Sequence, residues 1–394
     1  MKNSKINYLI NIKSLNQIKI KVIYIFFLLT GLLFSPFILN GEKKIIPYSD
    51  KPNQSTNTPS NNQTINVSSA TKYRGVNCQS QYKQKNFIDL KNLYGANLVR
   101  WSLTMNKVQI AEVGSDLTKY DVWLNNRLNE LDSVLLISRE LGIKVVIDLF
   151  TVPVGPRDSL GRTVFYNKHF NDHFVKVWQI IAQRYKGNPT VWGYDLINEP
   201  VQKKIPDGGM DFIQTQIRAS KVIWKIDQKT PIIFEVDNWD SPDRFISLKP
   251  VPISNVIYEV HMYQTSLYTH QGVYNKATNI VYPGMIGGKL YNKNTLRKIL
   301  QPVRDFELKY HVPVYVGEFS AVRWAPGAAH YINDCIDIFE EYGWNWTYCA
   351  YRVSNFWDVE YENGILRTEK AKKAIQDTDR KKVLLKWFSK NKKE

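Results

Sequence analysis

Residues 191–198 read VWGYDLIN and residues 312–319 read VPVYVGEF, two apolar runs that both contain acidic residues. Such runs are typical of strands that are buried on both faces of a parallel sheet. Six similar runs lie at 71–77, 96–103, 143–150, 231–236, 255–262 and 345–351. Segments of helical period separate many of them, at 124–141, 169–185, 211–227, 294–309 and 329–342. Eight strands alternating with helices predict an α/β protein with a single (β/α)8 TIM barrel domain.

The net charge first suggests a nucleic acid or membrane partner, because the 394 residues carry a formal charge of +17. Most of this charge lies outside the strand-rich part: residues 1–70 contribute +6 and residues 367–394 contribute +7. Residues 71–366 keep only +4 and contain no recognisable nucleic-acid-reading motif. We therefore expect no nucleic-acid partner.

The amino-terminal segment predicts export. Residues 1–21 are basic, with lysines as their only charges, and residues 22–40 contain the uncharged run VIYIFFLLTGLLFSPFIL. This order predicts either a cleaved signal peptide or an uncleaved membrane anchor. Residues 41–70 are poor in apolar groups and predict a disordered polar linker, which leaves residues 71–394 for the barrel and a basic carboxyl-terminal helix. The domain should therefore be secreted or anchored outside the cytoplasm, with membrane contact only through the amino-terminal segment.

Polar and ionisable residues close several predicted strands. The second strand ends near Arg100, the fourth in Asn198 and Glu199, the sixth in His261 and Tyr263, and the seventh in Glu318. The carboxyl ends of barrel strands meet at one rim, and buried polar groups must pair, so we expect one cluster. Two glutamates there suit glycosidic bond cleavage, one protonated and one ionised. Arg100 would hold one carboxylate anionic, while a more apolar setting would raise the pKa of the other.

Motifs around these residues resemble a known family. WGYDLINEP (192–200), VYVGEFS (314–320), RGVN (74–77), NLVRWSL (97–103) and VHMYQ (260–264) are similar to the retaining glycoside hydrolases of family 5, the cellulase family. The resemblance covers about residues 71–366. It implies that Glu199 is the acid/base and that Glu318 is the nucleophile. It also implies that four residues bind substrate or orient the pair, namely Asn198 at the sugar 2-hydroxyl, Arg100 and Tyr263 beside the nucleophile, and His261 beside the acid/base.

The sequence departs from the family pattern at two positions. The third strand ends in Phe150 where the family commonly has a histidine, and the eighth places Cys349 where the family commonly supplies a tryptophan. Aromatic rings stack on sugar faces, so side chains near the rim are candidate sugar platforms. The candidates are Phe150, Trp239, Trp324, Trp346 and Trp357, with simple loop packing as the alternative for Trp239 and Trp324.

Two features of the chain allow alternatives. Cys78 and Cys349 follow neighbouring strands of a closed barrel, so a disulfide between them is one hypothesis and free thiols are the other. The tail from 370 to 393 is basic with interspersed apolar residues. It predicts a final helix packed on the barrel, or alternatively an amphipathic segment on anionic lipid.

These observations predict an exported retaining glycoside hydrolase that acts on a polysaccharide or oligosaccharide. The activity that they favour is that of an endo-β-1,4-glucanase. The alternatives are a β-mannanase or other β-glycanase, and a non-catalytic glycan-binding protein on a degraded barrel. Two carboxyl groups suffice for the chemistry, and no Cys/His cluster has zinc-like spacing, so we expect neither metal nor organic cofactor. We expect a monomer, with the carboxyl groups of Glu199 and Glu318 about 5 to 5.5 Å apart.

Overall fold

A computed structural model of the chain describes residues 71–79, 82–154, 163–274 and 276–392. The basic region, apolar segment and linker that we predicted at residues 1–21, 22–40 and 41–70 all lie outside the described residues. Export therefore stays a prediction.

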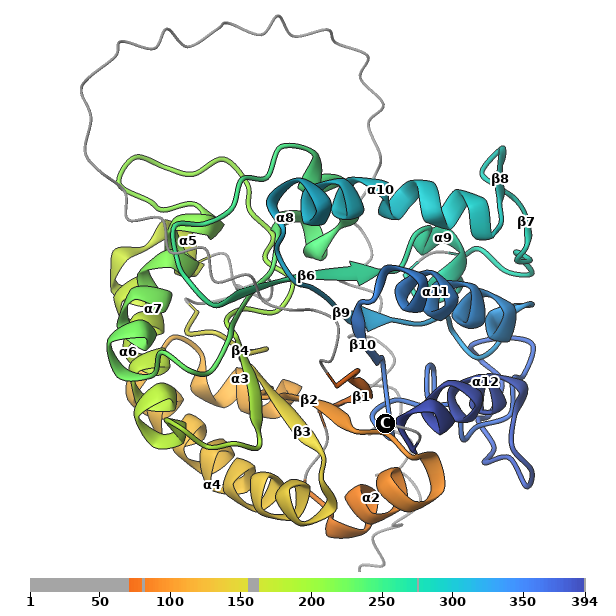
Figure 1. Cartoon of the computed structure of the whole chain (residues 1–394), viewed down its shortest axis with the longest axis horizontal. Coiled ribbons are helices and arrows are strands. Elements are labelled where there is room, and N and C mark those ends of the chain that lie inside the picture. Colours follow the sequence, from red (N-terminus) through yellow and green to blue (C-terminus); the bar gives the residue numbers. More distant parts are fainter. Residues whose placement is uncertain (1–70, 80–81, 155–162, 275, 393–394) are drawn as a thin grey trace, which may run out of the picture. The chain divides into compact units, whose positions relative to one another are not determined.

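Eight parallel strands close into a barrel in the order β1-β10-β9-β6-β5-β4-β3-β2 (Figure 1). The strands are β1 (Arg74–Cys78), β2 (Leu98–Ser102), β3 (Lys144–Asp148), β4 (Val191–Asp195), β5 (Ile232–Phe234), β6 (Val256–Met262), β9 (Val314–Phe319) and β10 (Asn345–Tyr348). Each lies within or overlaps one of the eight predicted runs. The predicted (β/α)8 barrel is confirmed.

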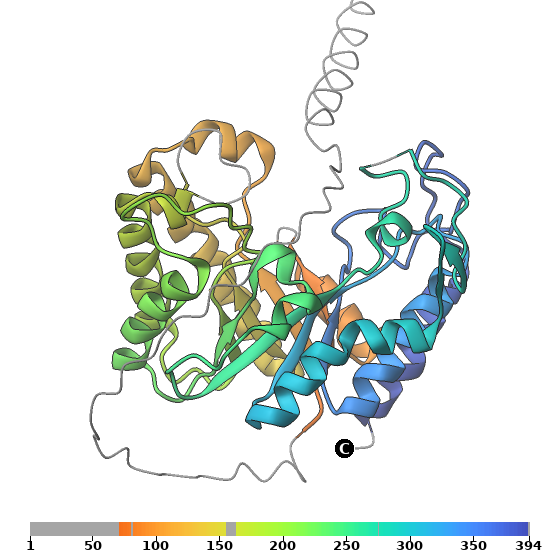
Figure 2. The same cartoon turned by 90° about the horizontal axis from the view of Figure 1, so that it is seen from above.

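Helices surround the strands and bury their apolar faces against them (Figures 1 and 2). The long ones are α4 (Leu117–Leu141), α6 (Lys168–Tyr185), α7 (Phe212–Ile226), α10 (Lys293–Tyr310) and α11 (Ala328–Tyr342), which confirm the five predicted helical segments. Shorter helical elements are α2 (Gln84–Asp89), η2 (Leu90–Tyr94), α3 (Lys107–Val113), α5 (Thr163–Tyr166) and α9 (Ser266–Thr269).

Capping residues decide where the longest helix begins and ends. α4 starts at Leu117 rather than at the predicted residue 124, because the Asp116 side chain accepts hydrogen bonds from the backbone amides of Thr118 and Lys119. It ends at Gly142, whose left-handed backbone at φ 65° suits a residue without a Cβ. The apolar period alone located the helix from residue 124 to its end at Leu141 and missed its first turns.

The connection from β5 to β6 differs from the others. It contains only the short helix α8 (Asp237–Asp240) and the 3-10 helix η3 (Pro242–Ile246). Three successive residues here, Asn238, Trp239 and Asp240, have positive φ between 51° and 63°. Farther along, β7 (Gly284–Ile286) and β8 (Lys289–Tyr291) pair as a small antiparallel hairpin outside the barrel, which we did not predict.

The barrel interior contains two chemically different layers. We call the first the apolar layer: Leu98, Val146, Ile233, Ile257 and Tyr315, a buried cluster distinct from the main core between strands and helices. For four of these residues, the side chain two positions later in the sequence is ionisable. The four ionisable residues are Arg100, Asp148, Glu235 and Glu259. These four, together with Asp195 at the end of β4, we call the charged layer. The charged layer lies on the carboxyl-terminal side of the apolar layer, next to the rim where the strands end.

The carboxyl-terminal tail forms α12 (Asp379–Phe388) and the 3-10 turn η4 (Ser389–Lys392), and α12 packs against α11. Leu384, Trp387 and Phe388 are buried, which confirms core packing for these apolar residues. Cys78, Cys335 and Cys349 are free thiols, so the hypothesised bridge between Cys78 and Cys349 is not formed.

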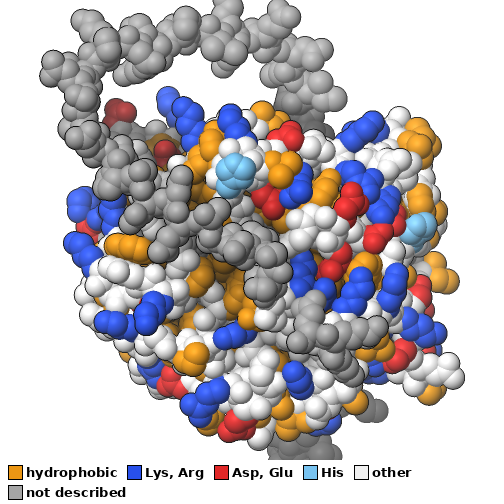
Figure 3. All heavy atoms as spheres, viewed as in Figure 1, with side chains coloured by type: hydrophobic (Ala, Val, Ile, Leu, Met, Phe, Trp, Pro, Cys, Tyr) orange, Lys and Arg blue, Asp and Glu red, His pale blue; other side chains and the backbone are white. Residues whose placement is uncertain are grey.

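Two surface observations bear on membranes and nucleic acids. Across the part of the chain that the structure describes, no helix has both the length and the apolar character to cross a bilayer. On the face seen in Figure 3, Lys and Arg side chains are interspersed with Asp and Glu and form no continuous basic stripe.

Candidate active site

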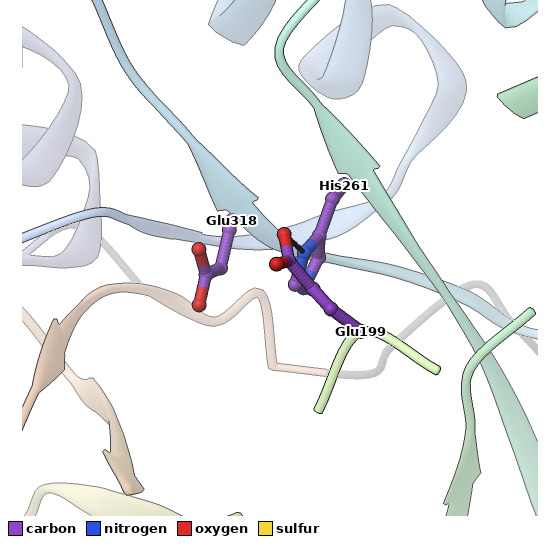
Figure 4. A group of neighbouring side chains, drawn as sticks. All are labelled: Glu199, His261 and Glu318. Atoms are coloured by element: carbon purple, nitrogen blue, oxygen red, sulfur yellow. Dashed lines mark hydrogen bonds and ion pairs between the residues drawn. The ribbon is translucent and has the colours of Figure 1, made fainter. Parts of the chain in front are cut away.

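Three side chains from different strands converge at the carboxyl-terminal rim of the barrel. Glu199 follows β4, His261 lies on β6 and Glu318 lies on β9, and their side chains gather in one place (Figure 4). One carboxylate oxygen from each glutamate and one imidazole nitrogen all lie within 4.8 Å of one another. The predicted pair is therefore brought together in space, from positions 119 residues apart in the sequence.

Glu318 is held by donors on both carboxylate oxygens. Arg100 Nη1 donates to Oε1 at 3.0 Å, and the Tyr263 hydroxyl donates to Oε2 at 2.9 Å. Burial by itself would raise the pKa of Glu318, but the charges of His261 and Arg100 and the Tyr263 hydrogen bond outweigh it and lower that pKa. Glu318 is thus kept ionised.

Glu199 has a different environment. His261 Nδ1 lies 3.0 Å from its Oε1, and 26% of its side chain is exposed, against 8% for Glu318. Burial raises the pKa of Glu199, the negative charge of Glu318 adds to the effect, and contact with His261 opposes it without reversing it. The two carboxyl groups therefore have pKa values shifted in opposite directions, as predicted from the sequence.

His261 connects this pair to the charged layer below. Its other ring nitrogen, Nε2, lies 3.2 Å from Glu259 Oε1. Burial tends to lower the pKa of His261, but the surrounding carboxylates, above all Glu318 and Glu235, raise it well above its ordinary value. The imidazole therefore lies between two glutamates, with one on each ring nitrogen.

Arg100 is the centre of the charged layer. Its guanidinium is fully buried and contacts Asp148 at 3.2 Å, Asp195 at 2.6 Å, Glu235 at 2.8 Å and Glu259 at 3.3 Å, in addition to Glu318. The side chains of these four carboxylates are also 0% exposed. Burial raises the pKa of Asp148 and that of Asp195 to about 8, although Arg100 lowers both.

We did not predict roles for Asp148, Asp195, Glu235 or Glu259. The available signal was the two-residue spacing within each strand. An inward apolar residue is followed two positions later by an ionisable one in IIFE, VIYE and VVID (residues 232–235, 256–259 and 145–148). Successive side chains of a strand alternate between faces, so both members of each pair point to the same side.

Two asparagines complete the contacts of Arg100. Asn198, the predicted 2-hydroxyl ligand, accepts a hydrogen bond on Oδ1 from Arg100 Nη2 at 3.1 Å. Asn77, on β1, accepts from Arg100 Nη1 at 3.2 Å and donates from Nδ2 to the Gly317 carbonyl at 2.7 Å. Arg100 therefore orients Asn198 and the neighbouring Glu318 at the same time.

The aromatic candidates separate into buried and accessible groups. Trp346 is 0% exposed, stacks on Phe388 of α12 and donates to Glu340 of α11, so it faces the helices rather than the rim. Trp324 is 4% exposed and donates its indole N–H to the Gln271 carbonyl. Neither side chain is exposed enough to stack on a sugar. The expectation of a sugar platform is therefore wrong for Trp346, and for Trp324 the burial favours the loop packing that was its alternative. By contrast, Trp239 is 42% exposed.

Phe150 and Trp357 are half-buried and lie in the segments that follow β3 and β10. Trp357 lies edge to face with His270, at 5.5 Å between ring centroids, and His270 in turn contacts Tyr263 at 4.9 Å. Its indole nitrogen is buried and has no hydrogen-bond partner among the described residues. Trp357 is therefore connected through His270 to the tyrosine that holds Glu318.

Cys349 occupies the position where a tryptophan was expected. Its thiol neighbours Glu318 and Tyr263 and contributes to the lowered pKa of Glu318. Burial, followed by the charge of Glu318, raises the pKa of Cys349 itself well above its usual value. The side chain is thus a neutral thiol beside the carboxylate and not a sugar platform.

Three carboxylates of the charged layer could in principle hold a cation. One oxygen from each of Asp195, Glu235 and Glu259 lies within 4.8 Å of the others. Arg100 already contacts all three at 2.6 to 3.3 Å, so a cation of the chain itself lies among them. This cluster is better described as an arginine-centred network than as a metal site.

Comparisons with known proteins agree with this geometry. The model of the family Cellulase (glycosyl hydrolase family 5) matches residues 55–355. Endoglucanase C of Acetivibrio thermocellus is 26% identical over 265 residues, which are 58% of this chain and 75% of that protein. Cellodextrinase A of Ruminococcus flavefaciens is 27% identical over 238 residues, or 54% of this chain and 67% of the relative.

Solved structures support the fold. A hyperthermophilic endo-β-1,4-glucanase in complex with substrate superposes with a TM-score of 0.61 at 18% identity, covering 80% of this chain and 97% of the other. Cel5A of Thermotoga maritima in complex with mannotriose gives 0.61 at 20% identity with the same coverage. The match of the family model, over most of the barrel and both glutamate motifs, shows that this chain belongs to glycosyl hydrolase family 5 and is a glycoside hydrolase.

Proposed function

We propose that the chain hydrolyses β-1,4-linked glucan with retention of configuration, with Glu318 as nucleophile and Glu199 as acid/base. The observation that carries this proposal is the pair itself: two carboxyl groups on one rim, with oxygens within 4.8 Å and pKa values shifted in opposite directions. Inverting enzymes keep their carboxyl groups about 6.5 to 9.5 Å apart to admit a water, so the short approach favours double displacement.

In the first step, the ionised Glu318 attacks the anomeric carbon while Glu199 gives its proton to the leaving glycosidic oxygen. The bond from sugar to leaving group breaks, and an ester between sugar and Glu318 forms. Arg100 and Tyr263 position the attacking carboxylate through their bonds to its two oxygens. Asn198, held by Arg100, is placed to contact the sugar 2-hydroxyl.

In the second step, Glu199 must act as a base. The negative charge of Glu318 is one cause of the raised pKa of Glu199, and ester formation removes that charge. The pKa of Glu199 therefore falls in the intermediate, and the carboxylate can take a proton from the water that attacks the sugar. Release of the sugar restores the charge on Glu318 and the proton on Glu199.

Family relatives support a glucan substrate, because those named above are an endoglucanase and a cellodextrinase. Trp239, Trp357 and Phe150 offer accessible or half-buried rings at the rim for sugar stacking. A β-mannan is the second candidate, since a structural neighbour, Cel5A of Thermotoga maritima, has been solved with both cellobiose and mannotriose. We also propose export through residues 1–40, from their lysines and apolar run.

The test is reducing-end release from cellulose, mixed-linkage glucan, xyloglucan and mannan by the wild-type chain and by Glu318→Ala. We expect turnover of a β-1,4-glucan that the variant abolishes while its folding transition remains. Preferred turnover of mannan would move the substrate to the second candidate. Glycan binding without turnover by the wild type would overturn the proposal.

A further inference from the structure

The loop after β5 holds the loop that carries Glu199. One oxygen of the Glu235 carboxylate, Oε2, accepts a hydrogen bond from the backbone N–H of Glu199 at 2.5 Å. Three residues after Glu199, the backbone N–H of Gln202 donates to Asp237 Oδ1 at 2.7 Å. The acid/base is therefore attached to the neighbouring strand end through its main chain, at a point where its own backbone has a positive φ of 47°.

The same carboxylate reaches the other catalytic residue through Arg100. Glu235 Oε1 accepts from Arg100 Nη2 at 2.8 Å, and Arg100 Nη1 donates to Glu318 Oε1 at 3.0 Å. Glu235 is 1% exposed, and both of its backbone polar groups are bonded to one side chain of α7. The Gln216 amide nitrogen donates to the Glu235 carbonyl at 2.9 Å, and its oxygen accepts from the Glu235 amide at 3.2 Å.

We propose that Glu235 is a positioning residue that couples the acid/base to the nucleophile, by holding the Glu199 main chain with one carboxylate oxygen and Arg100 with the other. The inference rests on the proposed function. A non-glycine residue with positive φ keeps that conformation only when its surroundings enforce it. Glu235 supplies this enforcement, so its loss lets the Glu199 carboxyl move away from the leaving-group oxygen.

The role predicts a selective defect. Cleavage of an unactivated sugar needs the proton from Glu199, whereas departure of dinitrophenolate, a weakly basic leaving group, hardly does. The parameter kcat/KM reports the first step, up to ester formation, for both substrates. A misplaced acid therefore lowers kcat/KM for a cello-oligosaccharide far more than for a dinitrophenyl β-cellobioside. Complete loss of acid catalysis would make the two losses differ by ~100-fold or more.

Glu235→Gln places an amide, with a single acceptor oxygen, where two donors, the Glu199 N–H and Arg100, each need an acceptor. Asp148→Asn is the matched control, because Asp148 is equally buried and contacts Arg100 at 3.2 Å but has no contact with Glu199. The measurement is kcat/KM of wild type and both variants on cellotetraose and on 2,4-dinitrophenyl β-cellobioside. Each active site releases one dinitrophenolate when the ester forms, so the amplitude of this initial burst gives the concentration of active enzyme. Rates divided by that concentration exclude misfolded protein.

We expect E235Q to lose at least ~10-fold more on cellotetraose than on the aryl substrate, and D148N to lose similarly on both. Equal losses for E235Q on the two substrates would overturn the coupling role. Should E235Q yield no folded protein, Glu235→Asp carries the same comparison with the carboxyl group retained and its reach shortened. A wild-type enzyme that hydrolyses neither substrate would refute the proposed function instead, which keeps the two failures distinct.

Discussion

The apolar layer and the charged layer of the barrel stand two residues apart on the same strands, yet they have opposite chemistry. Leu98 precedes Arg100, Ile233 precedes Glu235 and Ile257 precedes Glu259, all of them buried. The apolar layer needs only to exclude water and fill space. The charged layer gathers its carboxylates around one guanidinium, and four of their buried oxygens, Oδ1 and Oδ2 of Asp148, Oδ1 of Asp195 and Oε2 of Glu259, have no hydrogen-bond partner among the described residues.

The difference teaches what each layer contributes. Replacing a buried ion pair by apolar residues is often neutral or stabilising, so a layer of buried carboxylates is a poor way to gain stability. Burial that raises the pKa of Asp148 and Asp195 to about 8 is consistent with that cost. The apolar layer stabilises the barrel, and the charged layer positions Glu199 and Glu318, the proposed catalytic pair.

The largest expected effect comes from removing the central cation. Arg100→Met leaves several buried carboxylates without their shared partner, and breaking such a network costs about 3–5 kcal/mol of unfolding free energy. Leu98→Met, in the apolar layer of the same strand, should cost less than about 1.5 kcal/mol. Urea denaturation of both variants measures the difference. Similar losses would mean that Arg100 does not organise the layer.

A second contrast adds one methyl group to each layer. A Cβ on Gly317 would lie 1.3 Å from Glu259 Oε1, whereas a Cβ on Gly193 would meet the tip of Ile233, Cδ1, at 2.7 Å. The buried carboxylate cannot move without losing its bonds to Arg100 and His261, but the isoleucine can turn. We expect Gly317→Ala to cost about 1–3 kcal/mol and Gly193→Ala clearly less, measured by thermal unfolding. The reverse order would contradict the rigidity of the charged layer.

A third prediction uses pH. The folded-state pKa of Asp148, raised by burial to about 8, lies above its unfolded value, so the native state retains a proton that the unfolded chain releases. Its stabilising contribution is full at low pH and is lost as pH rises toward 8. Asp148→Asn cannot titrate, so its melting temperature relative to wild type should rise between pH 5 and pH 8. A difference that stays constant over this range would show that Asp148 is ionised in the native state.

The smallest expected effect concerns Glu318, the proposed nucleophile. Tyr263 donates to Glu318 and helps to lower its pKa, so Tyr263→Phe should raise that pKa. The proposed mechanism needs ionised Glu318, so the acid limb of kcat/KM should move to higher pH by about one unit or less. Tyr185→Phe is the control, because that hydroxyl bonds to the Leu128 carbonyl in the helix layer. If the acid limb of Tyr263→Phe stays where it is in the wild type, Tyr263 does not control the pKa of Glu318.

The sequence was sufficient for the strands and for the rim residues, because buried strands and their polar ends leave a clear pattern. It was insufficient where the side-chain direction within a strand decides the outcome. Trp346 and Thr347 are neighbours on β10, but Thr347 bonds to Tyr315 of the apolar layer while Trp346 packs on α12. Only the register of the closed barrel fixes which of the two faces inward.

The charged layer escaped prediction for a related reason. Glu235 and Glu259 lie inside or directly after apolar runs, where a single acid can equally be a solvated strand end. Their partner, Arg100, is more than 130 residues away from each in the chain. Such contacts become visible only once the strands close into a cylinder and bring β2, β5 and β6 to one interior.

The central claim is double displacement by Glu318 and Glu199, and the stereochemistry of the first product tests it most directly. Proton NMR during the first minutes of cello-oligosaccharide hydrolysis distinguishes the anomers before mutarotation mixes them. We predict that the β-anomer appears first, because two inversions at the anomeric carbon give net retention. Initial formation of the α-anomer would mean a single displacement by water and would contradict the assignment of Glu318 as nucleophile.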